Sequence, residues 1–173
     1  MKEEGVASIC GMGGLGKTTL AKMVYNHHQV QRHFDRRAWV YISQQFQRRR
    51  VWEDILISLL SPSKDQRDDI RTLNNAMLVE KIRQVQQEQT CLVILDDIWK
   101  IEDWNILREV FPMENTDSKI LLSSRNKNLA LYVDPRGLHE LQCLNNEKSW
   151  ELLEKIAISW RSGKILFFLE KLI

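Results

Sequence analysis

An α/β fold, in which helices flank a parallel β-sheet, is the class that the sequence predicts. Short apolar runs rich in β-branched and aromatic residues alternate with segments of helical period, which is typical of repeated strand and helix units. One run, residues 91–95, is apolar at every position, as expected for a strand buried on both faces of a sheet. A chain of 173 residues is also long enough to bury one ordinary hydrophobic core.

The strands of the predicted sheet are the apolar runs between the helical segments. They are residues 6–10, 37–43, 91–95, 119–123 and 138–141. A helix is expected over residues 18–26, and clearer helices over 51–60 and 72–87, where apolar residues recur at helical spacing. The polar connection 61–71 contains Pro62 and predicts a surface loop between the last two helices.

Two further helices are predicted from capping residues that precede apolar segments. Asp103 is expected to cap one helix, and Asn145 or Asn146 the other. The stripe of the second helix comprises Ser149, Leu152, Leu153, Ile156, Ala157 and Trp160. We expect such stripes to face the core, because apolar helix faces in a chain of this length mostly serve internal packing.

The composition is that of a soluble globular protein. Hydrophobic residues make up 43% and charged residues 28% of the chain, and no apolar run reaches the roughly 18 residues of a bilayer-spanning helix. The N-terminus lacks the pattern of a signal peptide, so a cytoplasmic location is expected. A net charge of +2 gives no general attraction to nucleic acid, and the cluster Arg48-Arg49-Arg50 is expected to lie in a solvated loop.

Cysteine and histidine show no pattern of a zinc or iron site. Cys10, Cys91 and Cys143 are odd in number and lack metal-ligand spacing, so we interpret them as buried thiols. The four histidines form no metal-binding constellation. We therefore expect no metal other than Mg²⁺.

A glycine-rich phosphate-binding loop follows the first predicted strand. Its sequence, Gly11-Met12-Gly13-Gly14-Leu15-Gly16-Lys17-Thr18, fits G-x-x-x-x-G-K-[ST] and leads into the first predicted helix. Glycines let main-chain N–H groups gather around one phosphate chain, and the helix N-terminus adds its positive end. Lys17 is expected to reach the β- and γ-phosphates, Thr18 to bind Mg²⁺ and Thr19 to contact the α-phosphate. The alternative, a glycine-rich turn with a solvated lysine, leaves the spacing and the flanking elements unexplained.

An acidic pair ends the apolar run 91–95. Asp96 and Asp97 stand where a buried parallel strand meets a bound nucleotide, which identifies a Walker B strand. A carboxylate there can reach a Mg²⁺-bound water, so Asp96 is predicted to be the metal-side acid and Asp97 to position the hydrolytic water. The alternative for both aspartates is a cap on the strand or on the next turn.

An arginine follows the polar tip of the predicted strand 119–123. Arg125 leaves the sheet where a guanidinium group can approach a γ-phosphate, and it could sense the triphosphate. The spacing alone fits an ordinary surface arginine equally well, so both interpretations stay open at this point.

Together these motifs resemble the NB-ARC nucleotide-binding domain of plant intracellular immune receptors, which belongs to the STAND class of P-loop NTPases. Residues 11–19 look like its P-loop, and residues 34–43 (FDRRAWVYIS) look like the motif that follows its first helix. Residues 95–99 (LDDIW) resemble its Walker B signature, with Trp99 similar to the coiled-coil rather than the TIR subgroup. Residues 119–126 resemble its sensor strand, and residues 138–158 look like the segment that closes the nucleotide subdomain. The resemblance covers about residues 5–161.

The resemblance implies a P-loop NTPase three-layer sandwich with a five-stranded parallel sheet in the order 2-3-4-1-5. It implies a switch that holds ADP when inactive, exchanges it for ATP after a pathogen effector is perceived, and oligomerises to trigger defence and hypersensitive cell death. It also favours Arg125 as the residue that senses the triphosphate. The implied partners are an adenine nucleotide, the other receptor domains and further copies of the receptor, with no direct contact to nucleic acid.

Compared with whole members of that family, the chain is expected to be a truncated part. We interpret residues 1–161 as the nucleotide-binding subdomain and residues 162–173 as the start of a missing ARC region. The segment upstream that helps to hold the adenine, the winged-helix region and the leucine-rich repeats are also expected to be missing. Weaker nucleotide retention than in a full receptor is the expected consequence.

Two other functions remain open from the sequence. An active ATPase or a small-molecule kinase needs an acceptor pocket or a further general base, which no motif marks, so at most slow ATP hydrolysis is expected. A non-switching interaction fragment, or the product of a pseudogene, is favoured by the apolar run of residues 165–169 in the tail.

Overall fold

The computed structural model describes residues 5–112 and 116–159. The chain divides into two compact units, residues 1–141 and residues 142–173. Among the described residues, the first unit contains every strand and every predicted site residue, and the second contains helix α8 (Asn146–Ser159). The predicted tail, residues 162–173, lies outside the described residues.

Five parallel strands form the sheet of the first unit. They are β1 (Val6–Cys10), β2 (Arg36–Tyr41), β3 (Cys91–Ile98), β4 (Lys119–Ser124) and β5 (Leu138–Glu140). Their order is β2-β3-β4-β1-β5, so the predicted order 2-3-4-1-5 is confirmed. The chain leaves β2 and returns as β3 through helices, as parallel pairing requires.

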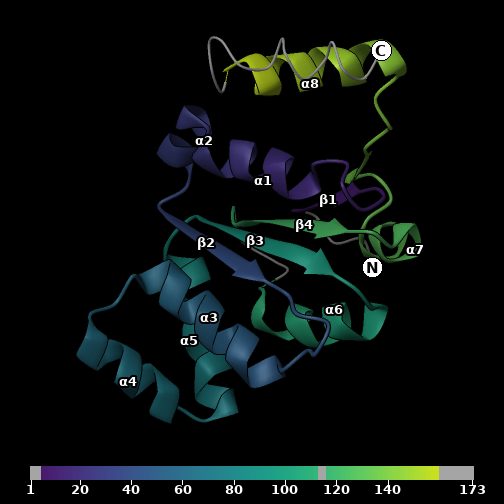
Figure 1. The fold of residues 1–173 in the computed structure, drawn as a ribbon. Coiled ribbons are helices and arrows are strands. Elements are labelled where there is room, and N and C mark those ends of the chain that lie inside the picture. The colour runs from purple at the N-terminus through teal and green to yellow at the C-terminus, as the bar shows by residue number, and fades with distance from the viewer. Residues whose placement is uncertain (1–4, 113–115, 160–173) are drawn as a thin grey trace. The chain divides into compact units, whose positions relative to one another are not determined.

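Helices cover both faces of this sheet and make a three-layer sandwich (Figure 1). Helices α1 (Lys17–Asn26) and α2 (His28–His33) lie on one face, whereas α3 (Arg48–Leu60), α5 (Asn75–Glu88) and α6 (Ile101–Leu107) lie on the other (Figure 1). All eight residues of β3 are buried, as predicted for a central strand without a solvent-facing side. Leu92 and Ile94 pack toward α1, and Val93 and Leu95 pack toward α3 and α5.

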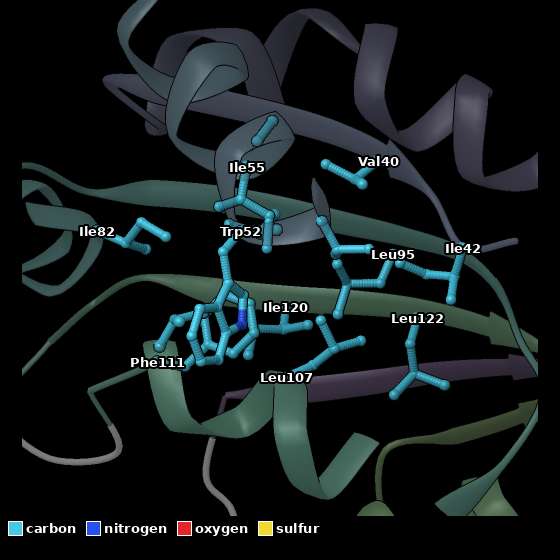
Figure 2. Close-up of a cluster of buried hydrophobic side chains, with 14 of the residues drawn as sticks. Val40, Ile42, Trp52, Ile55, Ile82, Leu95, Leu107, Phe111, Ile120 and Leu122 are labelled. Atoms are coloured by element: carbon cyan, nitrogen blue, oxygen red, sulfur yellow. The ribbon is translucent and has the colours of Figure 1, made fainter. Parts of the chain in front are cut away.

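The larger core lies between the sheet and helices α3, α5 and α6 (Figure 2). The fully buried indole of Trp52 projects from α3 into this layer (Figure 2). The same cluster contains aliphatic side chains from strands and helices on this side of the sheet, among them Ile42, Ile55, Ile82, Leu95, Leu107 and Leu122. Burying an aliphatic side chain contributes about 1.5–3 kcal/mol, so this layer stabilises the packing of the helices against the sheet.

The prediction of a loop over residues 61–71 was wrong, because α4 (Lys64–Thr72) occupies most of that segment. Ser63 and Gln66 form a reciprocal capping box at its start. Ile70 is the only buried residue of α4, so the helix gives almost no apolar period. The chain also forms α2 and α7 (Lys127–Val133), which the sequence analysis did not predict.

Several helix starts differ from those predicted. Asp103 does not cap α6 but lies inside it, since the helix begins at Ile101. The Arg48-Arg49-Arg50 cluster forms the first turn of α3 rather than a loop. Asn145 does cap α8, where its side chain accepts a hydrogen bond from the Lys148 N–H at 2.8 Å.

Helix α8 does not bury its predicted stripe. The side chains of Leu152 and Leu153 are about half exposed, with fractions of 48% and 55%. The side chains of Ile156 and Ala157, and the whole of Trp160, lie outside the described residues. The expectation that this stripe faces a core is therefore wrong for its described part.

The cysteines fall into two classes. Cys10 and Cys91 are buried, as predicted, but Cys143 is exposed, which contradicts its interpretation as a buried thiol. Burial raises the pKa of the Cys91 thiol to about 11. Within the described residues, no helix has the length and apolar character that crossing a bilayer requires.

The raised pKa of Cys91 predicts a large difference in thiol reactivity. At pH 8 we expect iodoacetamide to modify Cys143 at least about 10-fold faster than Cys91, because the thiolate is the nucleophile and only Cys143 is accessible. Mass spectrometry of timed reactions measures both rates. Unfolding in urea should equalise them, and equal rates in the folded protein would contradict the burial of Cys91.

Candidate nucleotide-binding site

The phosphate-binding loop joins the end of β1 to the start of α1. Gly14 and Gly16 have φ angles of 83° and 87°, a left-handed conformation that favours glycine over residues with a Cβ atom. Gly16 precedes α1, and no side chain caps that helix. The first N–H groups of α1 therefore face the loop without a side-chain acceptor, which suits an anionic ligand.

Lys17 folds back over this loop from the first turn of α1. Its ammonium group donates hydrogen bonds to the carbonyl oxygens of Gly11 and Met12, each at 2.8 Å, and the residue is only 7% exposed. The loop thus encloses one positive charge beside the free helix N-terminus. Such a pairing of main-chain N–H groups with a lysine is the arrangement that binds polyphosphate.

The two residues predicted to bind Mg²⁺ lie together. The Thr18 hydroxyl donates to the Asp96 carboxylate, at 3.1 Å from each of its oxygens. Asp96 is 3% exposed and stands on β3, two strands away from β1. A hydroxyl and a carboxylate are hard oxygen donors, so this pair fits a magnesium ion that also binds nucleotide phosphates.

Ser123 adds a contact that the sequence analysis did not assign to the site. Its hydroxyl donates to Asp96 Oδ1 at 2.6 Å and accepts from the Asp97 N–H at 2.9 Å. The signal in the sequence was a pair of serines at the tip of an otherwise apolar strand. Polar residues at such a position need partners, and the Walker B strand is the neighbour that supplies them.

Asp97 and Arg125, predicted to act on the γ-phosphate side, form an ion pair. Arg125 Nη2 lies 3.4 Å from Asp97 Oδ2, and the guanidinium carbon lies 4.9 Å from the centre of the Trp99 ring. Asp97 has a φ of 66°, and the pairing of β3 with β4 is irregular between Leu95 and Ile98. This bulge turns the Asp97 side chain toward Arg125. Trp99 is a partner of Arg125 that the sequence analysis did not identify.

The other predicted nucleotide contacts lie on the exposed side of the loop. Met12, Gly13 and Thr19 are exposed, while Leu15 packs near Gly11. Within residues 5–112 and 116–159, no group of three or more His, Cys, Asp or Glu residues is arranged to hold a metal ion. A metal at Thr18 and Asp96 therefore depends on ligand oxygens from the nucleotide and water.

A groove of about 970 Å³ runs along the outer edge of β2 and against α3. Its lining includes Tyr25, Arg37, Trp39 and Arg50, and none of the predicted site residues. The groove is therefore separate from the phosphate-binding loop and does not provide an acceptor pocket beside Asp97.

The fold and the site define the class of protein. A phosphate-binding loop between β1 and α1, with an acidic residue at the end of β3 in a sheet of this order, is the arrangement of a P-loop NTPase. The fold is similar to that of Drosophila ORC, with a TM-score of 0.61 at 20% identity over 87% of this chain and 40% of that one. It is also similar to ORC2 of Aeropyrum pernix, with a TM-score of 0.58 at 20% identity over 87% and 45% of the two chains.

Within this class, the chain belongs to the NB-ARC domain family, whose model matches residues 1–163. It is 55% identical over 159 residues to At1g50180 of Arabidopsis thaliana, which is named as a disease resistance protein. It is 43% identical over 157 residues to disease resistance protein RPP8 of the same plant. The matches cover 91% and 90% of this chain but 18% and 17% of those proteins, so the chain spans less than a fifth of their length.

The left-handed conformation of Gly14 predicts an asymmetry between two neighbouring glycines. Gly14→Ala should lower the free energy of unfolding by about 1–2 kcal/mol, because alanine is strained at a φ of 83° although its Cβ has open space. Gly13→Ala is the matched control, since its Cβ makes only an ordinary 3.5 Å contact with Arg125. Urea unfolding measures both variants. Equal stabilities would contradict the loop conformation.

Proposed function

We propose that this chain is the ADP- and ATP-binding switch domain of a plant disease-resistance receptor. The observation that carries the proposal is the meeting of the Thr18 hydroxyl and the Asp96 carboxylate at 3.1 Å, next to the buried ammonium group of Lys17. These three groups come from two elements that are far apart in the sequence, and their joint use is to bind a polyphosphate with its counter-ion.

The phosphate chain binds to the loop of residues 11–16 in this proposal. The N–H groups of the loop and of the first turn of α1 donate to phosphate oxygens, and Lys17 donates to the β- and γ-phosphates. Thr19, on the exposed side of that turn, contacts the α-phosphate. The N–H groups of the loop contact phosphates and not the base, so they do not select adenine. We propose adenine because of family membership.

Thr18 and Asp96 would hold Mg²⁺, which neutralises charge on the β- and γ-phosphates when it is bound. The Thr18 hydroxyl would still donate its hydrogen bond to the Asp96 carboxylate and would offer an oxygen lone pair to the metal. Asp96 would contribute the negative charge that holds the metal beside the loop, as a Walker B carboxylate does.

Arg125 distinguishes the two nucleotides in this proposal. Its present partners, Asp97 and the Trp99 ring, hold it beside Gly13 of the loop. A γ-phosphate is the stronger partner for a guanidinium group, so ATP would draw Arg125 away from them and ADP would not. That difference in contacts is what a switch between an inactive ADP state and an active ATP state requires.

Nucleotide binding, rather than rapid turnover, is the activity that this geometry favours. The groove along β2 is lined by none of the predicted site residues, so it supplies no acceptor pocket or further general base beside Asp97. Slow ATP hydrolysis is therefore the most that we assign to the chain. The remaining parts of the proposal, a cytoplasmic location, contacts with other receptor domains, self-association on activation and hypersensitive cell death, rest on family membership.

Lys17→Ala should weaken ADP binding at least about 10-fold, because each charge-assisted contact to phosphate contributes about 1.5–3 kcal/mol. Lys22→Ala is the matched control, since Lys22 is an exposed lysine of the same helix. Isothermal calorimetry with ADP measures both affinities. Unchanged ADP affinity in Lys17→Ala would contradict the P-loop assignment. No ADP binding by the unaltered protein would contradict the proposed function.

Arg125→Ala should raise the Kd for the non-hydrolysable ATP analogue ADPNP about 10-fold while changing the Kd for ADP by less than about 2-fold. The reason is that only the triphosphate offers the group that Arg125 is proposed to contact. Calorimetry with both nucleotides measures the ratio, and Arg136→Ala, which removes another exposed arginine from an ion pair, serves as the control. An equal loss for both nucleotides would contradict the sensor role.

A further inference from the structure

Ser123 stands at the centre of a chain of hydrogen bonds that joins the two acidic residues of the site. The Asp97 N–H donates to Ser123 Oγ, Ser123 Oγ donates to Asp96 Oδ1, and the Thr18 hydroxyl donates to the same carboxylate. Ser123 is 1% exposed, so water cannot replace these bonds. We infer that Ser123 is a positioning residue for the magnesium site, an inference that rests on the proposed function.

The direction of the Ser123 hydroxyl is fixed by its neighbours. A hydroxyl has one proton to donate, and the Asp97 N–H already uses one of its lone pairs. The proton therefore points to Asp96, at a distance of 2.6 Å that is typical of a charge-assisted hydrogen bond. The carboxylate cannot rotate without breaking this bond inside a buried environment.

The consequence is that the two oxygens of Asp96 are not equivalent. Oδ1 accepts from both Ser123 and Thr18, whereas Oδ2 accepts from Thr18 alone among the described residues. Ser123 thus engages Oδ1, so a magnesium ion with its bound water would meet Oδ2, which only Thr18 contacts among the described residues. Partners that orient a metal-binding carboxylate in this way commonly account for about 10–100-fold in metal affinity.

The same hydroxyl also holds the backbone of Asp97. That residue has a left-handed φ of 66°, which is unfavourable for a residue other than glycine unless its surroundings fix it. The bond from its N–H to Ser123 is such a constraint. Ser123 therefore orients the Asp96 carboxylate directly, and it orients the Asp97 carboxylate indirectly by fixing the main chain of that residue.

A second buried serine supplies a matched control. Ser8 lies on the neighbouring strand β1 and is also 1% exposed, but its hydroxyl has no hydrogen-bond partner among residues 5–112 and 116–159. Ser8→Ala and Ser123→Ala each remove one buried oxygen from adjacent strands. Only the second removes contacts to Asp96 and Asp97.

The test compares the Kd for ADPNP in EDTA with that in saturating MgCl2, by calorimetry on the whole chain. We expect Ser123→Ala to reduce the tightening caused by Mg²⁺ about 10-fold or more, and to leave the Kd in EDTA within about 2-fold of the unaltered protein. Ser8→Ala should change neither value. If Ser123→Ala fails to fold, Ser123→Cys, whose thiol is a weak donor of similar size, should reduce the effect of Mg²⁺ in the same direction.

The outcomes separate this inference from the proposed function. If the unaltered protein binds ADPNP no more tightly with Mg²⁺ than without, the proposed magnesium site is wrong and the inference goes with it. If the unaltered protein responds to Mg²⁺ and both Ser123 variants respond equally well, only the positioning role is overturned. An equal loss in EDTA and in MgCl2 would also overturn it, because a general structural defect would then account for the result.

Discussion

The hydrogen bond between Thr18 and Asp96 is the contact on which the rest of the site depends. It joins residues 78 positions apart, Thr18 in the first turn of α1 and Asp96 on β3, and β4 lies between β3 and β1, the strand that precedes α1. It forms because all five strands are parallel, so that the carboxyl ends of β1, β3 and β4 meet at one edge of the sheet. Apolar packing against both faces fixes that alignment. A one-residue slip of β4 would turn Ser123 to the opposite face and would exchange Leu121 and Leu122 between the two core layers, so the core and the site require the same register.

The strands and the phosphate-binding loop could be predicted from the sequence because their signals are local. Fully apolar runs identify buried parallel strands, and a glycine motif with a lysine is itself the binding element. Helix α4 was not predicted because it buries only Ile70 and therefore has no apolar period in its sequence. The spacing of Ser63 and Gln66, which is that of a capping box, does indicate a helix start there. The prediction that Cys143 is buried was wrong because the absence of metal-ligand spacing does not indicate whether a cysteine is buried.

The contacts around Asp97 could not have been predicted in this way, because they depend on a departure from regular structure. The left-handed backbone of Asp97 and the irregular pairing after Leu95 have no signature in residue types. The structure shows what holds this conformation, because the Asp97 N–H donates a hydrogen bond to Ser123 Oγ at 2.9 Å. Strain of this kind persists where surrounding contacts fix it, and it tends to occur at functional sites. The residue motifs therefore predicted a set of side chains at one edge of the sheet, but not which of them would be paired with each other.

The site combines groups that are held firmly with one that is held loosely. Lys17 and Asp96 are buried and each makes two or more hydrogen bonds, so they suit the phosphates and metal that both nucleotides share. Arg125 is half exposed, and an ion pair of that kind is worth about 1 kcal/mol or less. A contact to phosphate is worth about 1.5–3 kcal/mol, so a γ-phosphate can outcompete Asp97. A ligand moves an equilibrium only through its unequal affinity for two states, and in the proposed switch the loosely held arginine is where that inequality arises.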